Sequence, residues 1–437
     1  MSTRYVFWRM PDGRPYRGTD GKHSPSELLA EFGRISSVTP DGKVSWTGFI
    51  YNRLEIAFKL AVVVISPAGE ELNESASWQI LRSAAQEVIK KLGGKRPLPA
   101  DAVLKAADSK AADYFRKSED AYVLISSLSV ESLPFKKVRV AGCEITPLSS
   151  RKKYPFPPSA QHTGVAAIGD HIKSSRYQLV SVRTSGRNAH EAADKAFRAL
   201  NLLRGVWSLS VTYGSWTVRI GGVNRDPLGV IRTGPIHTLH HPNGKLVGDF
   251  YFYERAATED RHLFKPNVEW QKIEKNRRWV MNHIRRLPFG NDVEDLIIRY
   301  VIALDQTDHD AAFLQMWSIL EKITNTVGAN YDETIRRTVW LFSDRSLARD
   351  FLECARLQRN LLVHAAKSTE EPDQAAYLIK SFVEPHLTHL IQNGFGLSTL
   401  EEYGQHLCLP TDLKTLQRNR RWIAKAIRFQ IKKASKK

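Results

Sequence analysis

The chain contains little cysteine. Only three of its 437 residues are cysteines, and they stand far apart at Cys143, Cys354 and Cys408. An odd and scattered set argues against a disulfide framework and predicts a reducing compartment. None of them belongs to a CxxC pair, so a cysteine-based zinc site is not expected. The first ten residues also lack the apolar core of a secretory signal, and we therefore expect a cytoplasmic protein.

Long apolar runs are missing as well. No run reaches the ~18–20 residues that a membrane-spanning helix needs, so a membrane partner is not expected. The longest run, residues 56–65, is interrupted by Lys59 and is rich in valine, which favours a buried strand. The chain has no GxSxG, P-loop or GxGxxG stretch, which argues against a hydrolase elbow, an ATPase and a dinucleotide site. We expect no cofactor.

Acidic residues are few relative to basic ones. The chain has 46 Asp and Glu against 64 Lys and Arg, which gives a formal net charge of +18. An excess of this size favours a polyanionic partner, most often a nucleic acid, through contacts with phosphate groups. The simpler alternative is a solvated basic surface that binds no ligand.

The order of the predicted elements indicates an α+β protein. Residues 1–260 read as a mixed α/β region, with a possible internal break in the Pro- and Ser-rich stretch 147–170. Within this region, helical spacing covers residues 189–204, and a strand is expected over residues 207–220. Residues 261–437 read as an all-helical bundle. Its helices are expected at about 268–287, 293–305, 310–327, 332–342, 345–366, 373–393 and from 412 onward.

Residues 345–366 predict one helix with two unlike faces. On a wheel of about 100° per residue, apolar side chains gather on one side: Phe351, Ala355, Leu361, Leu362 and Ala365. Arg359, Asn360 and His364 fall on the other side, within an arc of about 140°. We expect the apolar side to face the core and the polar side to face solvent.

The pattern Arg359-Asn360-x3-His364 resembles the signature of the HEPN superfamily, which consists of small helical domains that include many metal-independent ribonucleases. The flanking sequence looks most similar to the ApeA-like branch, which is found in phage defence. The resemblance covers residues 290–410 or thereabouts. It implies a helical-bundle ribonuclease in which Arg359, Asn360 and His364 are catalytic. It also implies a supporting role for Glu321, which lies on a preceding predicted helix.

The bare spacing is not selective, because an arginine followed by a histidine after four to six residues recurs in this chain. Four other pairs fall in turns or at the domain junction: Arg17/His23, Arg183/His190, Arg232/His237 and Arg255/His262. A fifth pair, Arg278/His283, lies on a predicted helix but carries Trp279 in place of the polar residue. We therefore prefer the pair in 345–366, which has the asparagine and an apolar opposite face.

These residue types suit cleavage of RNA without a metal ion. An imidazole exchanges protons near neutral pH, and a guanidinium can hold two phosphate oxygens. Asn360 lies one turn before His364, where it can orient the ring or contact the phosphate. One imidazole does not easily act as base and acid in a single pass, and HEPN proteins pair, so the resemblance implies a homodimer with a composite site. The expected products are a 2′,3′-cyclic phosphate and a 5′-OH.

The segment from Asp412 to the last residue is strongly basic, with ten Lys or Arg and one acid. Its apolar stripe contains Trp422, Ile423, Ile427 and Ile431. The candidate RNA-binding residues are Arg418, Arg420, Arg421, Lys425 and Arg428. The alternatives are a docked helix with a solvated face and a helix on an anionic membrane. A second possible RNA contact is the triplet 151–153, Arg-Lys-Lys, beside Tyr154 and Phe156.

Three clusters of metal-ligand residue types have simpler explanations. The first lies at a predicted helix start, where acids satisfy free amide groups: Asp305, Asp308, His309 and Asp310. The second precedes a turn and consists of His237, His240 and His241. The third lies on a helix without HExxH spacing and consists of Glu384, His386 and His389. No metal site is expected.

The leading interpretation is an endoribonuclease of an abortive-infection system, in which the carboxy-terminal HEPN domain cuts RNA. The amino-terminal region would then sense a trigger, such as a phage-derived protein. Two alternatives remain open. One is a non-catalytic nucleic-acid-binding or scaffolding protein, and the other is a HEPN toxin paired with a nucleotidyltransferase antitoxin.

Overall fold

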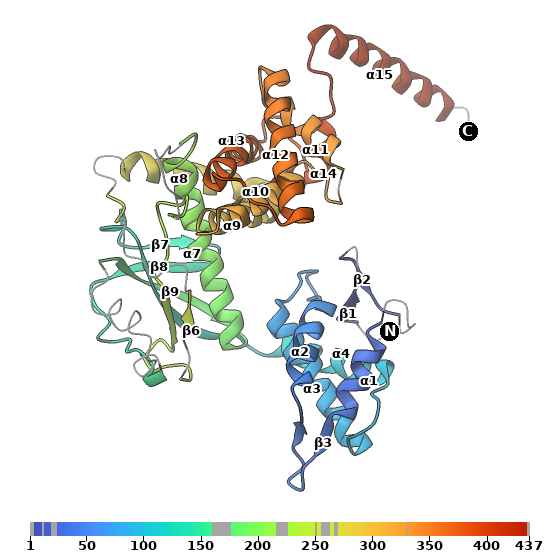
Figure 1. Ribbon diagram of the computed structural model, residues 1–437, viewed down its shortest axis with the longest axis vertical. Coiled ribbons are helices and arrows are strands. Elements are labelled where there is room, and N and C mark those ends of the chain that lie inside the picture. Colours follow the sequence, from blue (N-terminus) through green and yellow to red (C-terminus); the bar gives the residue numbers. More distant parts are fainter. Residues whose placement is uncertain are drawn as a thin grey trace. The chain divides into compact units, whose positions relative to one another are not determined.

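The computed structural model describes residues 4–10, 13–18, 24–159, 176–215, 226–249, 251–254, 263–265, 270–328 and 330–434 (Figure 1). The chain is an α+β protein with a helical carboxy-terminal part, as the sequence predicts. It divides into two compact units, Met1–Val123 with Arg183–Ala196, and Leu124–Val182 with Phe197–Lys437. No helix in the described ranges is long and apolar enough to cross a bilayer.

The first unit combines short strands with helices. The strands form a three-stranded sheet in the order β2-β1-β5 and a two-stranded sheet, β3-β4. Their bounds are Val6–Arg9 (β1), Pro15–Tyr16 (β2), Ser36–Val38 (β3), Val44–Trp46 (β4) and Val62–Val64 (β5). The helices are Ser26–Arg34 (α1), Ile50–Ala61 (α2), Glu74–Leu92 (α3) and Ala100–Arg116 (α4). Helix α3 illustrates how capping residues set the ends of a helix in this unit. Asn73 caps its first turn, and Gly93 ends it in a left-handed conformation (φ 82°).

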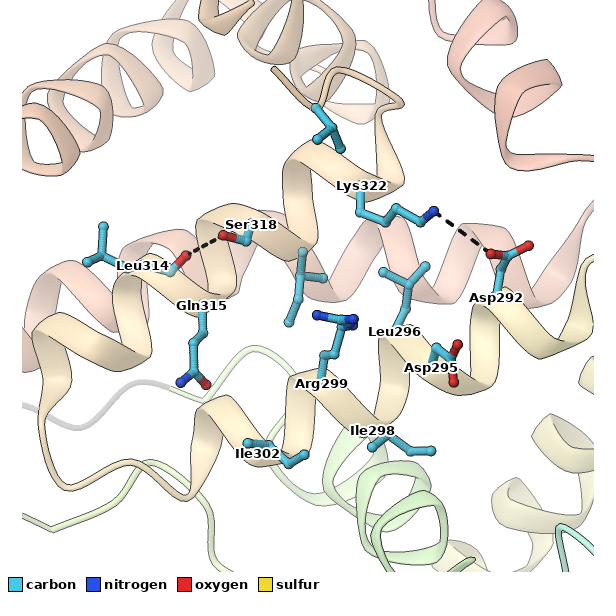
Figure 2. Close-up of a pocket in the computed structure, with 12 residues that line it drawn as sticks. Asp292, Asp295, Leu296, Ile298, Arg299, Ile302, Leu314, Gln315, Ser318 and Lys322 are labelled. Carbon is cyan, nitrogen blue, oxygen red and sulfur yellow. Dashed lines mark hydrogen bonds and ion pairs between the residues drawn. The ribbon is translucent and has the colours of Figure 1, made fainter. Parts of the chain in front are cut away.

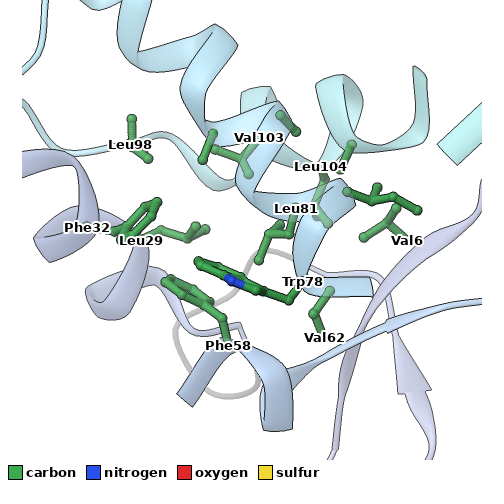
Figure 3. Packing of buried hydrophobic residues seen from close by; sticks show 14 of the residues in the cluster. Val6, Leu29, Phe32, Phe58, Val62, Trp78, Leu81, Leu98, Val103 and Leu104 are labelled. Carbon is green, nitrogen blue, oxygen red and sulfur yellow. The ribbon is translucent and has the colours of Figure 1, made fainter. Parts of the chain in front are cut away.

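Aromatic rings fill the core of this unit (Figure 3). The rings of Phe58 and Trp78 stack with centroids 5.6 Å apart, and Phe32 meets Trp78 edge-on at 5.7 Å. Phe58 lies on α2, so the strand expected over residues 56–65 is wrong for most of its length. Leu54 and Phe58 bury one helical face of α2, and only the valines that follow form β5. A short apolar run does not by itself distinguish a buried helix from a strand.

The second unit is built on a six-stranded sheet in the order β11-β10-β6-β9-β8-β7. The strands are Asp120–Leu128 (β6), Val138–Val140 (β7), Cys143–Leu148 (β8), Gln178–Gly186 (β9), Ile236–His240 (β10) and Phe252–Tyr253 (β11). Helix α7, Ala189–Val211, covers one face, where its Phe197 ring lies 4.9 Å from the His237 ring of β10. The strand expected over residues 207–220 is wrong for residues 207–211, because α7 continues to Val211, and residues 216–220 lie outside the described residues. Trp207 is fully buried, and its indole nitrogen donates to Glu274 at 2.9 Å.

The helical bundle follows the sheet in the chain. Its helices are Trp270–Arg286 (α8), Gly290–Leu304 (α9), His309–Ile323 (α10), Tyr331–Thr338 (α11), Arg345–Ala365 (α12), Pro372–Gln392 (α13), Leu400–His406 (α14) and Leu413–Ala434 (α15), with a short 3₁₀ turn Val339–Leu341 (η3). Helix α13 packs against α8, α9, α10 and α12, and α10 packs against α9, α11, α12, α13 and α14, so these two helices form the centre of the bundle. The long apolar face of α13 is buried accordingly.

The boundary expected between residues 260 and 261 does not separate the compact units, because the sheet and the bundle belong to one unit. Helix α7 contacts the bundle through buried polar groups. Arg204 of α7 donates to both carboxylate oxygens of Asp305, at 3.0 and 2.8 Å. Lys380 of α13 donates to the Thr212 carbonyl at 2.6 Å, just beyond the end of α7. These contacts join distant parts of the chain, so composition alone could not place the boundary. The possible break at 147–170 falls largely outside the described residues.

Candidate active site

Helix α12 carries the three predicted catalytic residues. Asp344 caps its first turn, because the carboxylate accepts a hydrogen bond from the Leu347 amide at 3.0 Å. The helix ends where Ala366 adopts a left-handed conformation (φ 49°). These ends agree with the expected range 345–366, and the predicted catalytic residues lie in the last two turns.

The burial of α12 differs from the expected one. Its buried residues recur at helical spacing and are Ala348, Leu352 and Ala355. The same spacing continues to Arg359, which is half-buried. Phe351 and Leu361, expected in the core, are 45% and 43% exposed. Small alanines allow neighbouring helices to approach this face closely, so α12 packs through its alanine stripe and leaves the more apolar side uncovered.

An aromatic ring supports Arg359. The guanidinium carbon lies 4.7 Å from the centroid of the Tyr331 ring, at the start of α11. The Tyr331 ring meets Trp317 of α10 edge-on at 6.2 Å, and the Trp317 indole donates to Glu321 at 2.8 Å. Glu321, the predicted supporting residue, is therefore linked to Arg359 through two rings. Sequence reasoning missed Tyr331, because it lies outside the signature and its contact with Arg359 arises only in the folded bundle.

Arg359 and Arg356, one turn earlier, differ in whether a carboxylate pairs with the guanidinium. Arg356 pairs with Asp332 and Glu353, each at 2.7 Å. Within the described part of the chain, no carboxylate pairs with Arg359. A guanidinium held by a ring keeps its full charge and its N–H donors for an anion.

Asn360 and His364 lie one turn apart beside Arg359. The Asn360 side-chain oxygen is buried and accepts no hydrogen bond from any described group. Leaving such an acceptor unpaired costs about 1–3 kcal/mol. His364 is exposed, and no described residue bonds to its ring. The exposure of the three side chains therefore increases from the half-buried Arg359 to the exposed His364. The sequence pattern predicts instead that all three side chains lie on the solvent side.

The rival pair lies on α8. Arg278 is exposed, but His283 Nδ1 donates to the Trp279 carbonyl at 2.8 Å, and its ring lies against the Trp279 ring at 4.1 Å. One of the two ring nitrogens of His283 is therefore engaged in a hydrogen bond within α8. Of the other pairs, His237 is fully buried in the sheet. The residues His23, Arg255 and His262 lie outside the described residues.

Helix α15 presents the predicted RNA-binding residues. Asp412 caps its start, because the carboxylate accepts from the Thr415 amide at 2.7 Å. The side chains from Arg420 to Ile431 are exposed, so no docked arrangement covers this helix. Four of the five predicted contacts recur at spacings of three and four residues and share one face: Arg418, Arg421, Lys425 and Arg428. Arg420 instead shares the face of Ile423 and Ile427, so its place among the RNA contacts is not supported by the helix geometry.

The second predicted RNA contact, residues 151–153, is not one exposed basic patch. The Arg151 guanidinium carbon lies 3.6 Å from the Phe156 ring centroid, and the Lys153 amine lies 5.5 Å from that of Tyr154. Arg151 is half-buried, whereas Lys152 and Lys153 are exposed. The segment therefore folds onto its own aromatic residues.

A hollow of about 1000 Å³ lies between α9 and α10 (Figure 2). Figure 2 shows Arg299 reaching into the space between the two helices. Lys322 lies 4.0 Å from Asp292, and Asp295 pairs with Arg198 of α7. Both acids at the rim are therefore paired, and no histidine lines the hollow. We assign no chemistry to it.

The clusters of metal-ligand residue types are engaged in other contacts. Asp308 caps α10, and His309 Nε2 donates to the Asp226 carbonyl at 2.9 Å. Glu384 pairs with Lys380 at 2.8 Å. His386 contacts the Tyr403 hydroxyl at 2.9 Å through Nδ1, and its Nε2 donates to the Thr338 carbonyl. The described residues include no group of three or more such side chains that could hold a metal ion.

The chain was compared with family models, with curated proteins and with solved structures, and none of them matches it.

Proposed function

We propose that the chain is a metal-independent endoribonuclease and that α12 carries its active site. The observation that supports this proposal is that three polar side chains with complementary chemistry lie together in the last two turns of α12. Arg359 has a guanidinium without a carboxylate partner in the described chain, Asn360 has a buried oxygen without a donor, and His364 has an exposed imidazole. Together they provide a cation for a phosphate, a polar group to position it and a group that can transfer a proton.

The proposed reaction uses the ribose itself as the nucleophile. An imidazole accepts the proton of the 2′-OH, and the 2′-oxygen then attacks the adjacent phosphorus. Arg359 stabilises the negative charge that builds up on the phosphoryl oxygens. The bond from phosphorus to the 5′-oxygen breaks, and that oxygen takes up a proton from a second acid. The products are a 2′,3′-cyclic phosphate and a 5′-OH.

We propose that a second copy of the chain supplies the second acid. A single α12 carries one histidine in this region, whereas the reaction needs a base and an acid. The face of α12 that carries His364 also exposes Leu357 and Leu361, seven and three residues earlier, which are 61% and 43% exposed. Pairing of two copies along this face would bury apolar surface and bring two sets of catalytic groups to one cleft. On the strength of the sequence resemblance alone, we propose a role in antiviral defence, with the first unit binding a phage-derived trigger.

Cleavage of labelled RNA by the purified full-length chain tests the proposal. The variant His364→Ala should lose at least about 100-fold in rate, because a positioned proton-transfer group contributes about 10²–10⁴-fold. The matched control is His283→Ala, which removes a helical histidine that also follows an arginine by five residues. The control should cleave as the wild type does, and EDTA should not inhibit either protein. Equal activity of wild type and His364→Ala would refute the assignment.

A second candidate function is non-catalytic nucleic-acid binding, which the exposed basic face of α15 favours. Four cations lie on that face without an acid among the residues of α15. The same experiment separates the two functions. Binding of RNA without cleavage, in wild type and His364→Ala alike, would support the binding function.

A further inference from the structure

A pocket of about 540 Å³ opens at one end of the six-stranded sheet. It lies where β6 and β8 end and where β9 and β10 begin. Its lining includes Ser127 of β6, Leu179 of β9 and Ile236 of β10. The segment after β8 completes the lining with Ser149, Arg151 and Phe156. All of these residues belong to the second unit.

The pocket lies on the face of the sheet opposite α7. His237 points toward α7, because its ring contacts Phe197. Side chains alternate along a strand, so Ile236 and Thr238 point to the other face. Arg151 donates a hydrogen bond to the Thr238 hydroxyl, which places the guanidinium on that face. The α7 side holds the contact between Phe197 and His237, whereas this side holds the Arg151 guanidinium.

Arg151 is held by its own segment but not by an acid. Its ring partner is Phe156, and its Nε donates to the Tyr154 carbonyl at 3.4 Å. Burial lowers the pKa of Arg151 to about 10. No carboxylate in the described ranges pairs with it, although Glu131 lines the pocket.

Two arginines that are more deeply buried do have acidic partners. Arg204 is bound by Asp305 at 2.8 Å, and Arg277 by Glu274 at 2.8 Å. A half-buried cation without an acidic partner is costly, because hydrogen bonds to neutral groups only partly replace the hydration that it loses. Such an arrangement is typical of a binding site, where stability is given up for function.

We propose that this pocket binds a nucleoside monophosphate, with the phosphate group on Arg151. The guanidinium has a planar fork that matches phosphate oxygens. A volume of about 540 Å³ lies within the range of small-molecule sites and is far larger than a phosphate ion needs. The apolar side chains of Leu148, Leu179 and Ile236 offer a surface for a flat base. Arg176, which also lines the pocket, adds positive charge.

The remaining polar side chains suit the ribose. Ser127 and Ser149 each carry a hydroxyl that can donate or accept. The carboxylate of Glu131 accepts hydrogen bonds from ribose hydroxyls, and it repels additional phosphate groups on its side of the pocket. A ligand with one phosphate at the Arg151 end therefore fits better than one with several. The inference does not depend on ribonuclease activity.

Calorimetric titration of the full-length chain tests the proposal. The probes are AMP, GMP, CMP, UMP, adenosine and inorganic phosphate. At least one nucleoside monophosphate should bind about tenfold tighter than inorganic phosphate, and adenosine should bind at least tenfold more weakly than AMP does. The variant Arg151→Met should weaken nucleotide binding at least about tenfold, because it removes charged hydrogen bonds. The matched control Arg53→Met removes another arginine that lies over a phenylalanine, Phe49, and should leave binding unchanged.

Two further measurements separate a loss of nucleotide binding from a loss of folding. Without ligand, Arg151→Met should show a cooperative thermal transition like that of the wild type, because methionine keeps an apolar contact with the Phe156 ring, although the hydrogen bonds to Thr238 and Tyr154 are lost. Ser149→Trp changes an exposed position at the rim and should block the pocket without affecting the fold. Failure of every nucleotide to bind, binding unaffected by both variants, or binding of RNA oligonucleotides alone would overturn the proposal.

Discussion

Arg359 is supported by the Tyr331 ring, whereas Arg356, one turn earlier, is neutralised by two carboxylates. This difference matters for chemistry, because an ion pair would compete with a phosphate for the guanidinium. A ring face attracts the cation without occupying its N–H donors. The arginine and histidine could be identified from their spacing in the sequence, but the ring that positions the arginine could not.

At the residue scale we predict that Tyr331 positions Arg359 for cleavage. Tyr331→Leu should lower kcat/KM about 3- to 10-fold, because a cation–ring contact is worth about 0.5–2 kcal/mol. Tyr331→Phe keeps the ring and should retain most of the activity. Steady-state kinetics on labelled RNA, with thermal melting of each variant, provides the measurement. Equal losses for the leucine and phenylalanine variants would show that the ring face does not support the arginine.

At the element scale, α12 shows that an apolar stripe predicts a buried face but not the partner that buries it. The helix periodicity was sufficient to predict its ends to within one residue, because local hydrogen bonds and the Asp344 cap set them. The face that packs inside the chain is the alanine stripe, so the more apolar stripe is left uncovered. An apolar stripe on a helix that no other part of the same chain covers indicates a surface for another chain.

We predict that Leu357→Glu prevents dimer formation. A charge beside His364 on the proposed dimer face would have to be buried without a partner, so the dissociation constant should rise at least about tenfold. Analytical ultracentrifugation over a range of concentrations gives this constant, and RNA cleavage should fall in parallel.

The matched control is Leu60→Glu, which changes an apolar residue that is 62% exposed on α2. It should leave both dimer formation and cleavage unchanged. A wild-type chain that remains monomeric at all concentrations, yet cleaves RNA, would contradict the dimeric site.

At the scale of the whole molecule, buried histidines make stability depend on pH. Burial lowers the pKa of His386 to about 4 and that of His237 to about 3, from an ordinary value near 6.5. Both side chains are fully buried. As the pH falls below about 6.5, the unfolded chain binds protons at these residues before the folded chain does. Stability from these groups is therefore fully present above pH 6.5 and is lost progressively toward pH 4.

We predict that His386 alone accounts for about 2 kcal/mol of the stability lost between pH 7.5 and pH 5.0. Replacement of His386 by glutamine should reduce the loss by about this amount, even though the variant is less stable at both pH values. Chemical denaturation at the two pH values measures the difference. A loss of unchanged size in the variant would contradict the assignment.

The sequence by itself determined the α+β class, the helices of the carboxy-terminal part and the position of the arginine-histidine pair. These features depend on hydrogen bonds and side-chain spacing within one segment, so a local pattern contains them. It did not determine whether Phe58 and Trp207 lie on strands or helices, because burial in the core decides this for aromatic residues. The ring under Arg359, the uncovered stripe of α12 and the unpaired Arg151 were decided only by the tertiary structure, since each depends on contacts between segments far apart in the chain.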